Sequence, residues 1–230
     1  FHTGFRMKYI EHHGGNIYSV AERLRIPENN IIDFSASINP LGVPKSVESA
    51  IKNNSRYLYN YPDPNVTQFR RQIAKYHNIK PESIICGNGS TELIYLVVRA
   101  LRPKRVLIPE PTFSEYKRAC RISCESRVIS YELKRQDNFD INSDKFISAM
   151  EGCDMTFLCN PNNPTGRLLK KEDVQKIANA AKRLKCYLIV DEAFIDFTPE
   201  HSVISEVKIN TYLIVLRSMT KFYALSGLRV

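Results

Sequence analysis

The chain of 230 residues, 43% of them hydrophobic, is long enough to bury a sizeable core, as one large domain or as one domain and a fragment. Its formal net charge of +9 raises the question of a nucleic-acid partner, but the cations are scattered and the densest groups lie beside acids in helical patterns. We therefore expect no nucleic-acid partner. Some of the lysines and arginines could instead bind an anionic small molecule.

The six cysteines form no CxxC pair, and no histidine lies near Cys120 or Cys124 in the sequence. We expect buried free thiols in a reducing compartment and no metal site. No apolar stretch is long enough to cross a bilayer and no signal-peptide pattern is present, so we expect a cytoplasmic protein without a membrane partner. Residues 1–6, which precede Met7, read as an expression remnant and are left out of the fold prediction.

Short apolar runs alternate with amphipathic segments along the chain. In chain order the pattern predicts a helix at 66–76, a strand at 83–86, a helix at 91–101, a strand at 105–108, a helix at 113–122, a strand at 126–131, a helix at 143–150, a strand at 155–159, a helix at 171–184 and strands at 187–190 and 212–216. The alternation predicts an α/β fold with a mostly parallel central sheet and helices on both faces. Ligands of such sheets bind beyond the carboxyl ends of the strands.

The first two predicted strands are followed by segments with two interpretations each. In GNGSTEL, Gly89, Ser90 and Thr91 either form a cradle for a phosphate or make an ordinary helix start with glycine turns. In PEPTFSEY, Phe113 lies either over a flat ring or in the core at a helix start.

The later predicted strands are followed by three more polar segments. The strand at 155–159 leads into NPNNPTG, a loop with two Asn-Pro pairs and a glycine. Asp191 ends a hydrophobic strand, where it either caps a helix or meets a partner with a protonated nitrogen. Lys221 follows the last strand, with Ser218 and Thr220 beside it, and is either a solvated charge or a Schiff-base lysine.

The order of these motifs is more specific than any one of them. With NNPTG, DEAF and SMTKFYALSGLR in this order, the chain resembles the fold-type I pyridoxal-phosphate enzymes of the aminotransferase superfamily, from about residue 12 to its last residue. The segments HHGGNIYSVAERL, DFSASINPLG, YNYPDP, GNGSTELI, PEPTFSEY and VDEAFIDF are most similar to the L-threonine-O-3-phosphate decarboxylases, which are relatives of the histidinol-phosphate aminotransferases.

The resemblance implies a cofactor, pyridoxal 5'-phosphate, and a role for each motif. Lys221 would bind the cofactor aldehyde as a Schiff base, Asp191 would pair with the ring nitrogen, and Asn163 would hydrogen-bond the phenolic oxygen. Phe113 would stack on the ring. The cofactor phosphate would be held by Gly89, Ser90, Thr91, Ser218 and Arg229, and by Tyr61 of the other subunit in a homodimer.

The resemblance also implies the substrate side of the site and the domain organisation. His13 and Asn39 would line the substrate site, although His13 is equally well explained as a surface histidine. Residues 1–40 would be an N-terminal segment that contributes to this site, and residues 41–230 would be a cofactor-binding large domain. We expect that domain to be incomplete at its C-terminus, because family members continue into a small domain that carries the arginine for the substrate carboxylate.

The implied reaction is decarboxylation of L-threonine O-3-phosphate, a small phosphorylated amino acid, to aminopropanol phosphate in cobalamin biosynthesis. Phe194 stands where aminotransferases usually carry a tyrosine, which favours the decarboxylase branch. The alternatives are transamination of histidinol phosphate and a catalytically incomplete fragment.

Overall fold

The computed structural model describes residues 14–228, and the chain forms two units, one up to Ile38 and one from Asn39 onward. In the first unit, helix α1 (Ile17–Leu24) begins where the Asn16 side chain accepts a hydrogen bond from the Ser19 amide at 3.1 Å. The second unit opens with helices α2 (Lys45–Asn54) and α3 (Thr67–His77).

From residue 90 the second unit alternates helices and strands, as the sequence predicts. The elements are α4 (Ser90–Leu101), β1 (Arg105–Glu110), α5 (Glu115–Cys124), β2 (Arg127–Glu132), α6 (Ser143–Ala149), β3 (Met155–Cys159), α7 (Lys171–Leu184), β4 (Tyr187–Asp191) and β5 (Leu213–Leu216). None of the helices within residues 14–228 is both long and apolar enough to cross a bilayer.

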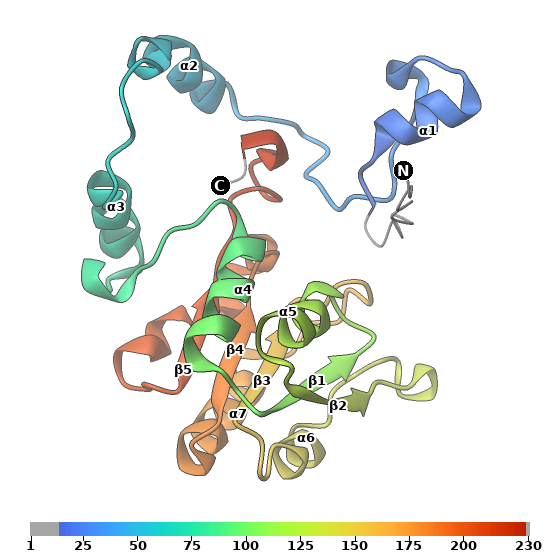
Figure 1. Ribbon diagram of the computed structural model, residues 1–230, viewed down its shortest axis with the longest axis vertical. Helices are drawn as coiled ribbons and strands as arrows, with labels where there is room; N and C mark the ends of the chain where they lie inside the picture. The colour runs from blue at the N-terminus through green and yellow to red at the C-terminus, as the bar shows by residue number, and fades with distance from the viewer. Residues whose placement is uncertain (1–13, 229–230) are drawn as a thin grey trace, which may run out of the picture. The chain divides into compact units, whose positions relative to one another are not determined.

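The strands form one five-stranded sheet in the order β2-β1-β3-β4-β5, and all neighbouring pairs are parallel (Figure 1). The chain goes from β1 to β2 on one side and then to β3 on the other side of β1. The order of the strands therefore reverses between β1 and β3, which is where open α/β sheets place their ligand crevice.

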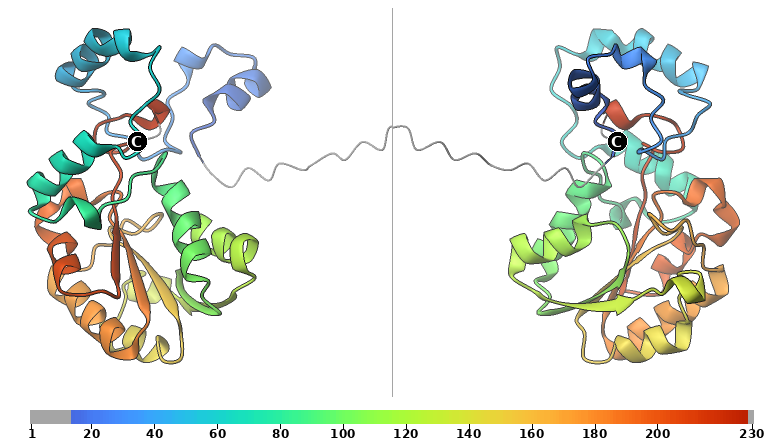
Figure 2. Two further views of the ribbon diagram at one scale, coloured as in Figure 1. Left: turned by 60° about the vertical axis from the view of Figure 1, so that its left-hand side comes forward. Right: turned by 90° about the vertical axis from the view of Figure 1, so that its right-hand side faces the viewer.

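Helices cover both faces of the sheet (Figures 1 and 2). Successive side chains of a strand point to opposite faces, and because the strands are mostly apolar, both faces are buried. On one face, Ile108, Phe157 and Ile189 pack with side chains of α4 and α5. On the other face, Leu158 and Leu188 pack with side chains of α6 and α7. The predicted fold class, a mostly parallel sheet with helices on both faces, is confirmed.

The predicted strand at residues 83–86 is wrong. Pro81–Ser83 form a 3₁₀ turn and the following residues have no regular structure. Ile85 is 77% exposed, so the apolar run Ile84-Ile85 is not covered on both sides as a central strand is. The other predicted strands and helices are present, with ends that differ by up to two residues.

Candidate active site

Three strands end side by side at the carboxyl edge of the sheet. The register pairs Cys159 of β3 with Asp191 of β4, and Asp191 with Leu216 of β5. The segments that follow these strands, which carry the predicted residues Asn163 and Lys221, therefore leave the same edge of the sheet.

Asp191 is buried at this edge, with 3% of its surface exposed. Its Oδ2 accepts a hydrogen bond from the Tyr116 hydroxyl at 2.7 Å, and its Oδ1 accepts one from the Ala193 amide at 3.0 Å. Burial raises the pKa of the Asp191 carboxyl, and the two donors oppose that rise. Asp191 does not cap a helix, because the 3₁₀ turn that follows, Ile195–Phe197, has Phe194 at its N-cap. The carboxylate is thus held in two directions, and no lysine, arginine or histidine of residues 14–228 forms an ion pair with it.

Tyr116 is a site residue that the sequence analysis missed. Its ring is fully buried on α5, stacked on Phe157 with 4.7 Å between centroids, and it meets the edge of Phe113 at 5.6 Å. Burial raises the pKa of the Tyr116 hydroxyl well above its usual range, and the nearby Asp191 adds to this effect. Tyr116 is therefore a neutral donor to Asp191. The available signal was its place three residues after Phe113 in the helix predicted at 113–122, where the two side chains would lie on the same side.

Asn162 joins the two loops at the point where the strand order reverses. Its Oδ1 accepts a hydrogen bond from Thr112 Oγ1 at 2.7 Å, and its Nδ2 donates to the Pro111 carbonyl at 3.0 Å. The segment after β3 is thereby fixed to the segment after β1, which carries Phe113. Asn162 was not predicted, because the spacing of the motif directs attention to Asn163.

Asn163 is the asparagine of this loop that remains for a ligand. Asn160 uses its carboxamide on both backbone groups of Leu169, at 3.1 and 2.8 Å, and Asn162 uses its own as described above. The Asn163 side chain is half-buried and makes no hydrogen bond to another residue in the described range 14–228. An amide held in place by its loop and left without a partner suits a polar group of a bound molecule.

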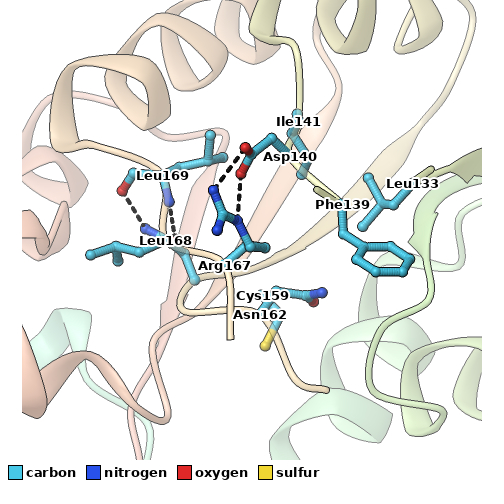
Figure 3. A pocket seen from close by; sticks show the side chains of 10 residues that line it. Leu133, Phe139, Asp140, Ile141, Cys159, Asn162, Arg167, Leu168 and Leu169 are labelled. Atoms are coloured by element: carbon cyan, nitrogen blue, oxygen red, sulfur yellow. Dashed lines mark hydrogen bonds and ion pairs between the residues drawn. The ribbon is translucent and has the colours of Figure 1, made fainter. Parts of the chain in front are cut away.

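A small pocket lies behind this loop (Figure 3) and has room for about one water molecule. Arg167 reaches Asp140 with two hydrogen bonds, Nε to Oδ1 at 2.7 Å and Nη2 to Oδ2 at 2.8 Å. This paired contact ties the end of the loop to the segment before α6. The pocket is too small for a substrate, so we assign it to the support of the loop.

Lys221 lies on a segment with several internal contacts. Ser218 and Thr220 are buried and share a hydrogen bond of 2.6 Å between their hydroxyl oxygens. Lys221 itself is half-buried. Asn39, predicted as a substrate contact, donates from its backbone amide to the Lys221 carbonyl at 3.1 Å and from its side chain to the Phe222 carbonyl at 2.8 Å. The structure therefore places Asn39 next to the Lys221 segment.

A buried ion pair connects the ends of β4 and β5. Glu192, 1% exposed, accepts hydrogen bonds from Arg217 Nη1 at 3.1 Å, the Ser202 hydroxyl at 2.7 Å and the Val203 amide at 2.8 Å. Arg217 also pairs with Asp196. Burial raises the pKa of Glu192, and its donors oppose the rise. The Glu192–Arg217 ion pair was not predicted from the sequence. It holds the residues before Ser218 against the residues after Asp191.

The predicted phosphate cradle lies at the start of α4. Gly89 is the N-cap with φ of 80°, a conformation that glycine adopts without strain, and no side chain caps the helix there. Ser90 and Thr91 are inside the first turn, so the alternative in which their hydroxyls cap the helix is not observed. The Asn88 amide instead donates to the Glu92 carboxylate. Helix amides and two hydroxyls remain as a donor set suited to an anion.

The structure does not bring Tyr61 to this edge through a described contact, and it does not describe His13 and Arg229. Tyr61 is fully exposed, after α2. His13 and Arg229 lie outside the described residues. Their predicted roles, contact with the substrate for His13 and with the cofactor phosphate for Tyr61 and Arg229, stay predictions.

Comparisons with known proteins place the chain among enzymes of this fold. It is 42% identical over 220 residues to threonine-phosphate decarboxylase of Salmonella typhimurium, covering 95% of this chain and 60% of that protein. It is 36% identical over 229 residues to the adenosylcobalamin biosynthesis bifunctional protein CobDQ of Leptospira interrogans, covering 96% of this chain and 26% of that protein. The histidinol-phosphate aminotransferase structure from Clostridium acetobutylicum superposes with a TM-score of 0.78 at 34% identity, covering 86% of this chain and 59% of that one.

The chain thus spans about 60% of the length of the first of these relatives. The family model described as aminotransferase class I and II matches residues 29–230, which is most of the sequence. That family consists of pyridoxal-phosphate-dependent enzymes. The chain belongs to the aminotransferase class I and II family.

Proposed function

We propose that the protein containing this chain is a pyridoxal-phosphate-dependent enzyme that decarboxylates L-threonine O-3-phosphate to aminopropanol phosphate, a step of cobalamin biosynthesis. The observation that carries cofactor binding is the buried Asp191 carboxylate at the carboxyl edge of the sheet, because a cationic ring nitrogen would supply the charge that this group lacks. The choice of decarboxylase rests on the 42% identity to a threonine-phosphate decarboxylase and on the similarity to a cobalamin-biosynthesis protein.

The residues of the chain suit the parts of the cofactor. Asp191 would keep the ring nitrogen protonated, Asn163 would donate to the phenolic oxygen, and Lys221 would hold the aldehyde covalently. Phe113 would lie over the ring, and the phosphate would be held by Gly89, Ser90, Thr91, Ser218 and Arg229. When bound, pyridoxal phosphate supplies an electron sink for the bond that breaks at the substrate Cα.

Substrate orientation decides which bond breaks. For decarboxylation the residues on the substrate side would have to favour cleavage of the bond between Cα and the carboxylate, and for transamination cleavage of the Cα–H bond. His13 is proposed to contribute on the substrate side. The 34% identity to a histidinol-phosphate aminotransferase of known structure makes histidinol-phosphate transamination the second candidate.

We further propose a homodimer, in which Tyr61 reaches the phosphate of the partner's cofactor. Tyr61 is completely exposed, as a residue that reaches a neighbouring subunit must be before assembly. A cytoplasmic location is supported by the six cysteines, all of which are free thiols.

Supplying the full-length protein with threonine phosphate tests the reaction. We expect carbon dioxide to be released without a 2-oxo acid. A requirement for 2-oxoglutarate, with formation of glutamate, would support transamination instead. The alternative of a catalytically incomplete protein is tested by adding pyridoxal phosphate and recording the absorbance spectrum. We expect a band near the edge of the visible range that Lys221→Ala abolishes, and this result would count against the alternative.

A further inference from the structure

Asn39 makes a two-point contact with the segment that carries Lys221, although 182 residues separate it from Lys221 in the sequence. Its backbone amide donates to the Lys221 carbonyl at 3.1 Å, and its Nδ2 donates to the next carbonyl, that of Phe222, at 2.8 Å. Its Oδ1 accepts from the Leu41 amide at 3.0 Å. Both ends of the Asn39 side chain are therefore occupied, and the whole residue is fixed in one orientation.

The segment it contacts is not part of a helix or strand. Residues 217–225 connect β5 to the 3₁₀ turn Ser226–Leu228. Their internal contacts include the Leu225 amide, which donates to the Thr220 carbonyl at 3.0 Å, the hydroxyl pair of Ser218 and Thr220, and the Ala224 amide, which donates to the Lys221 carbonyl at 3.4 Å. A segment without a helix or sheet ladder opens easily unless contacts from elsewhere hold it. The carbonyls of Lys221 and Phe222 receive such contacts from Asn39, and the Phe222 ring receives another from Phe197 at 5.1 Å between centroids.

We infer that Asn39 is a positioning residue for Lys221, which it holds through the backbone of the lysine segment. The role rests on the proposed function, in which Lys221 must present its amine at a fixed place to the cofactor aldehyde. It differs from the substrate contact expected from the sequence, because the Asn39 side-chain amide donates to the Phe222 carbonyl.

The substitution Asn39→Asp isolates the contact, because the two side chains have nearly the same shape. The aspartate keeps an acceptor for the Leu41 amide but loses the Nδ2–H donor, and it places a carboxylate oxygen against the Phe222 carbonyl. The matched control is Asn54→Asp. Asn54 Nδ2 donates to the Ala50 carbonyl at 2.8 Å within α2, so this change removes the same kind of hydrogen bond away from Lys221.

Hydrogen exchange of the full-length protein without cofactor gives a readout that does not depend on activity. We expect Asn39→Asp to speed exchange of amides in residues 218–225 by about tenfold relative to amides of β3 and β4, since a lost hydrogen bond and a new repulsion both favour opening. Asn54→Asp should leave that ratio unchanged. A general loss of stability would speed exchange in β3 and β4 as well, and the ratio separates this effect from a local one.

A second readout is covalent capture of pyridoxal phosphate by Lys221, trapped by borohydride reduction and located by peptide mapping. We expect capture by Asn39→Asp to be slower than by the wild type or Asn54→Asp. An unchanged exchange ratio in Asn39→Asp would overturn the inference. If the wild type captures no pyridoxal phosphate, the proposed function fails, whereas the exchange result still decides whether Asn39 holds the segment.

Discussion

The buried Asp191 carboxyl opposes the stability of the folded chain. Burial raises the pKa of this carboxyl in the folded chain. A folded state that binds the proton more tightly than the unfolded state loses stability as the pH rises, beginning near the unfolded pKa of about 4 and continuing up to the folded value. The raised pKa of the Asp191 carboxyl therefore lowers the stability of the cofactor-free protein at neutral pH.

We expect Asp191→Asn to stabilise the cofactor-free protein at pH 7 by roughly 1 kcal/mol, because the amide has a similar shape and no charge to bury. Thermal unfolding at pH 7 and at pH 4 measures the effect, which should shrink at the lower pH as the wild-type carboxyl becomes protonated. Asp137→Asn, at an exposed position, is the control and should change little. An Asp191→Asn protein less stable than the wild type at pH 7 would contradict this account.

Tyr116 acts on Asp191 through one hydrogen bond, so its removal should be visible without loss of packing. Tyr116→Phe keeps the ring against Phe157 but removes the donor to Oδ2. We expect the affinity for pyridoxal phosphate to fall about tenfold, since the ionised carboxylate loses a charge-assisted hydrogen bond. Equilibrium dialysis measures it. The control is Tyr95→Phe, because the Tyr95 hydroxyl also donates to a carboxylate, that of Glu115, at 2.7 Å. This variant should bind pyridoxal phosphate about as tightly as the wild type.

The candidate site residues that the sequence suggested lie at the end of a strand or within a few residues after it. Asp191 and Asn163 belong to this group, because a short segment after a strand has little freedom in where it goes. Tyr116 and Asn162 were missed for a different reason. Their importance comes from contacts with residues 75 and 50 positions away in the chain, Asp191 and Thr112 respectively, and local spacing does not show such contacts.

The ends of β4 and β5 are held together by the Glu192–Arg217 pair. Removing the cation would leave a buried carboxylate without a charge partner, which costs about 3 kcal/mol. We expect Arg217→Met to lower the free energy of unfolding by about that amount at pH 7, measured by urea denaturation, and by less at acidic pH where Glu192 is protonated. The rise in the pKa of Glu192 caused by burial sets the direction of this pH dependence.

The control for this ion pair is Arg118→Met. Arg118 is exposed and pairs with Glu115 at 3.4 Å, so its loss should cost less than 1 kcal/mol. Equal losses for the two substitutions would show that the buried pair does not hold the strand ends together.

Elements were predictable from the sequence where the apolar pattern is long, as in α7, whose observed bounds are the predicted ones. The segment 83–86 shows why the pattern alone is not sufficient. Ile84 and Ile85 have the composition of a strand, but a strand needs a neighbouring strand to pair with, and the preceding Pro81 turn leaves Ile85 exposed instead.

The chain exposes large apolar side chains in the region between α2 and α3. Leu58 and Tyr59 are mostly exposed and lie close in sequence to the fully exposed Tyr61. Exposed apolar groups that gather in one short segment are typical of a protein interface. In the proposed homodimer these side chains would be covered by the partner subunit.

We expect the double substitution Leu58→Ser, Tyr59→Ser to weaken association of the full-length protein. Each apolar side chain removed from an interface is worth about 1–3 kcal/mol, so the dissociation constant of the dimer should rise at least about tenfold. Sedimentation velocity at several protein concentrations measures it. Ile122→Ser, at an exposed position on α5, is the control and should leave the dimer unchanged. Because Tyr61 is proposed to reach the partner's cofactor, dissociation should also weaken retention of pyridoxal phosphate. If the double variant stays as dimeric as the control, the subunits associate through another surface.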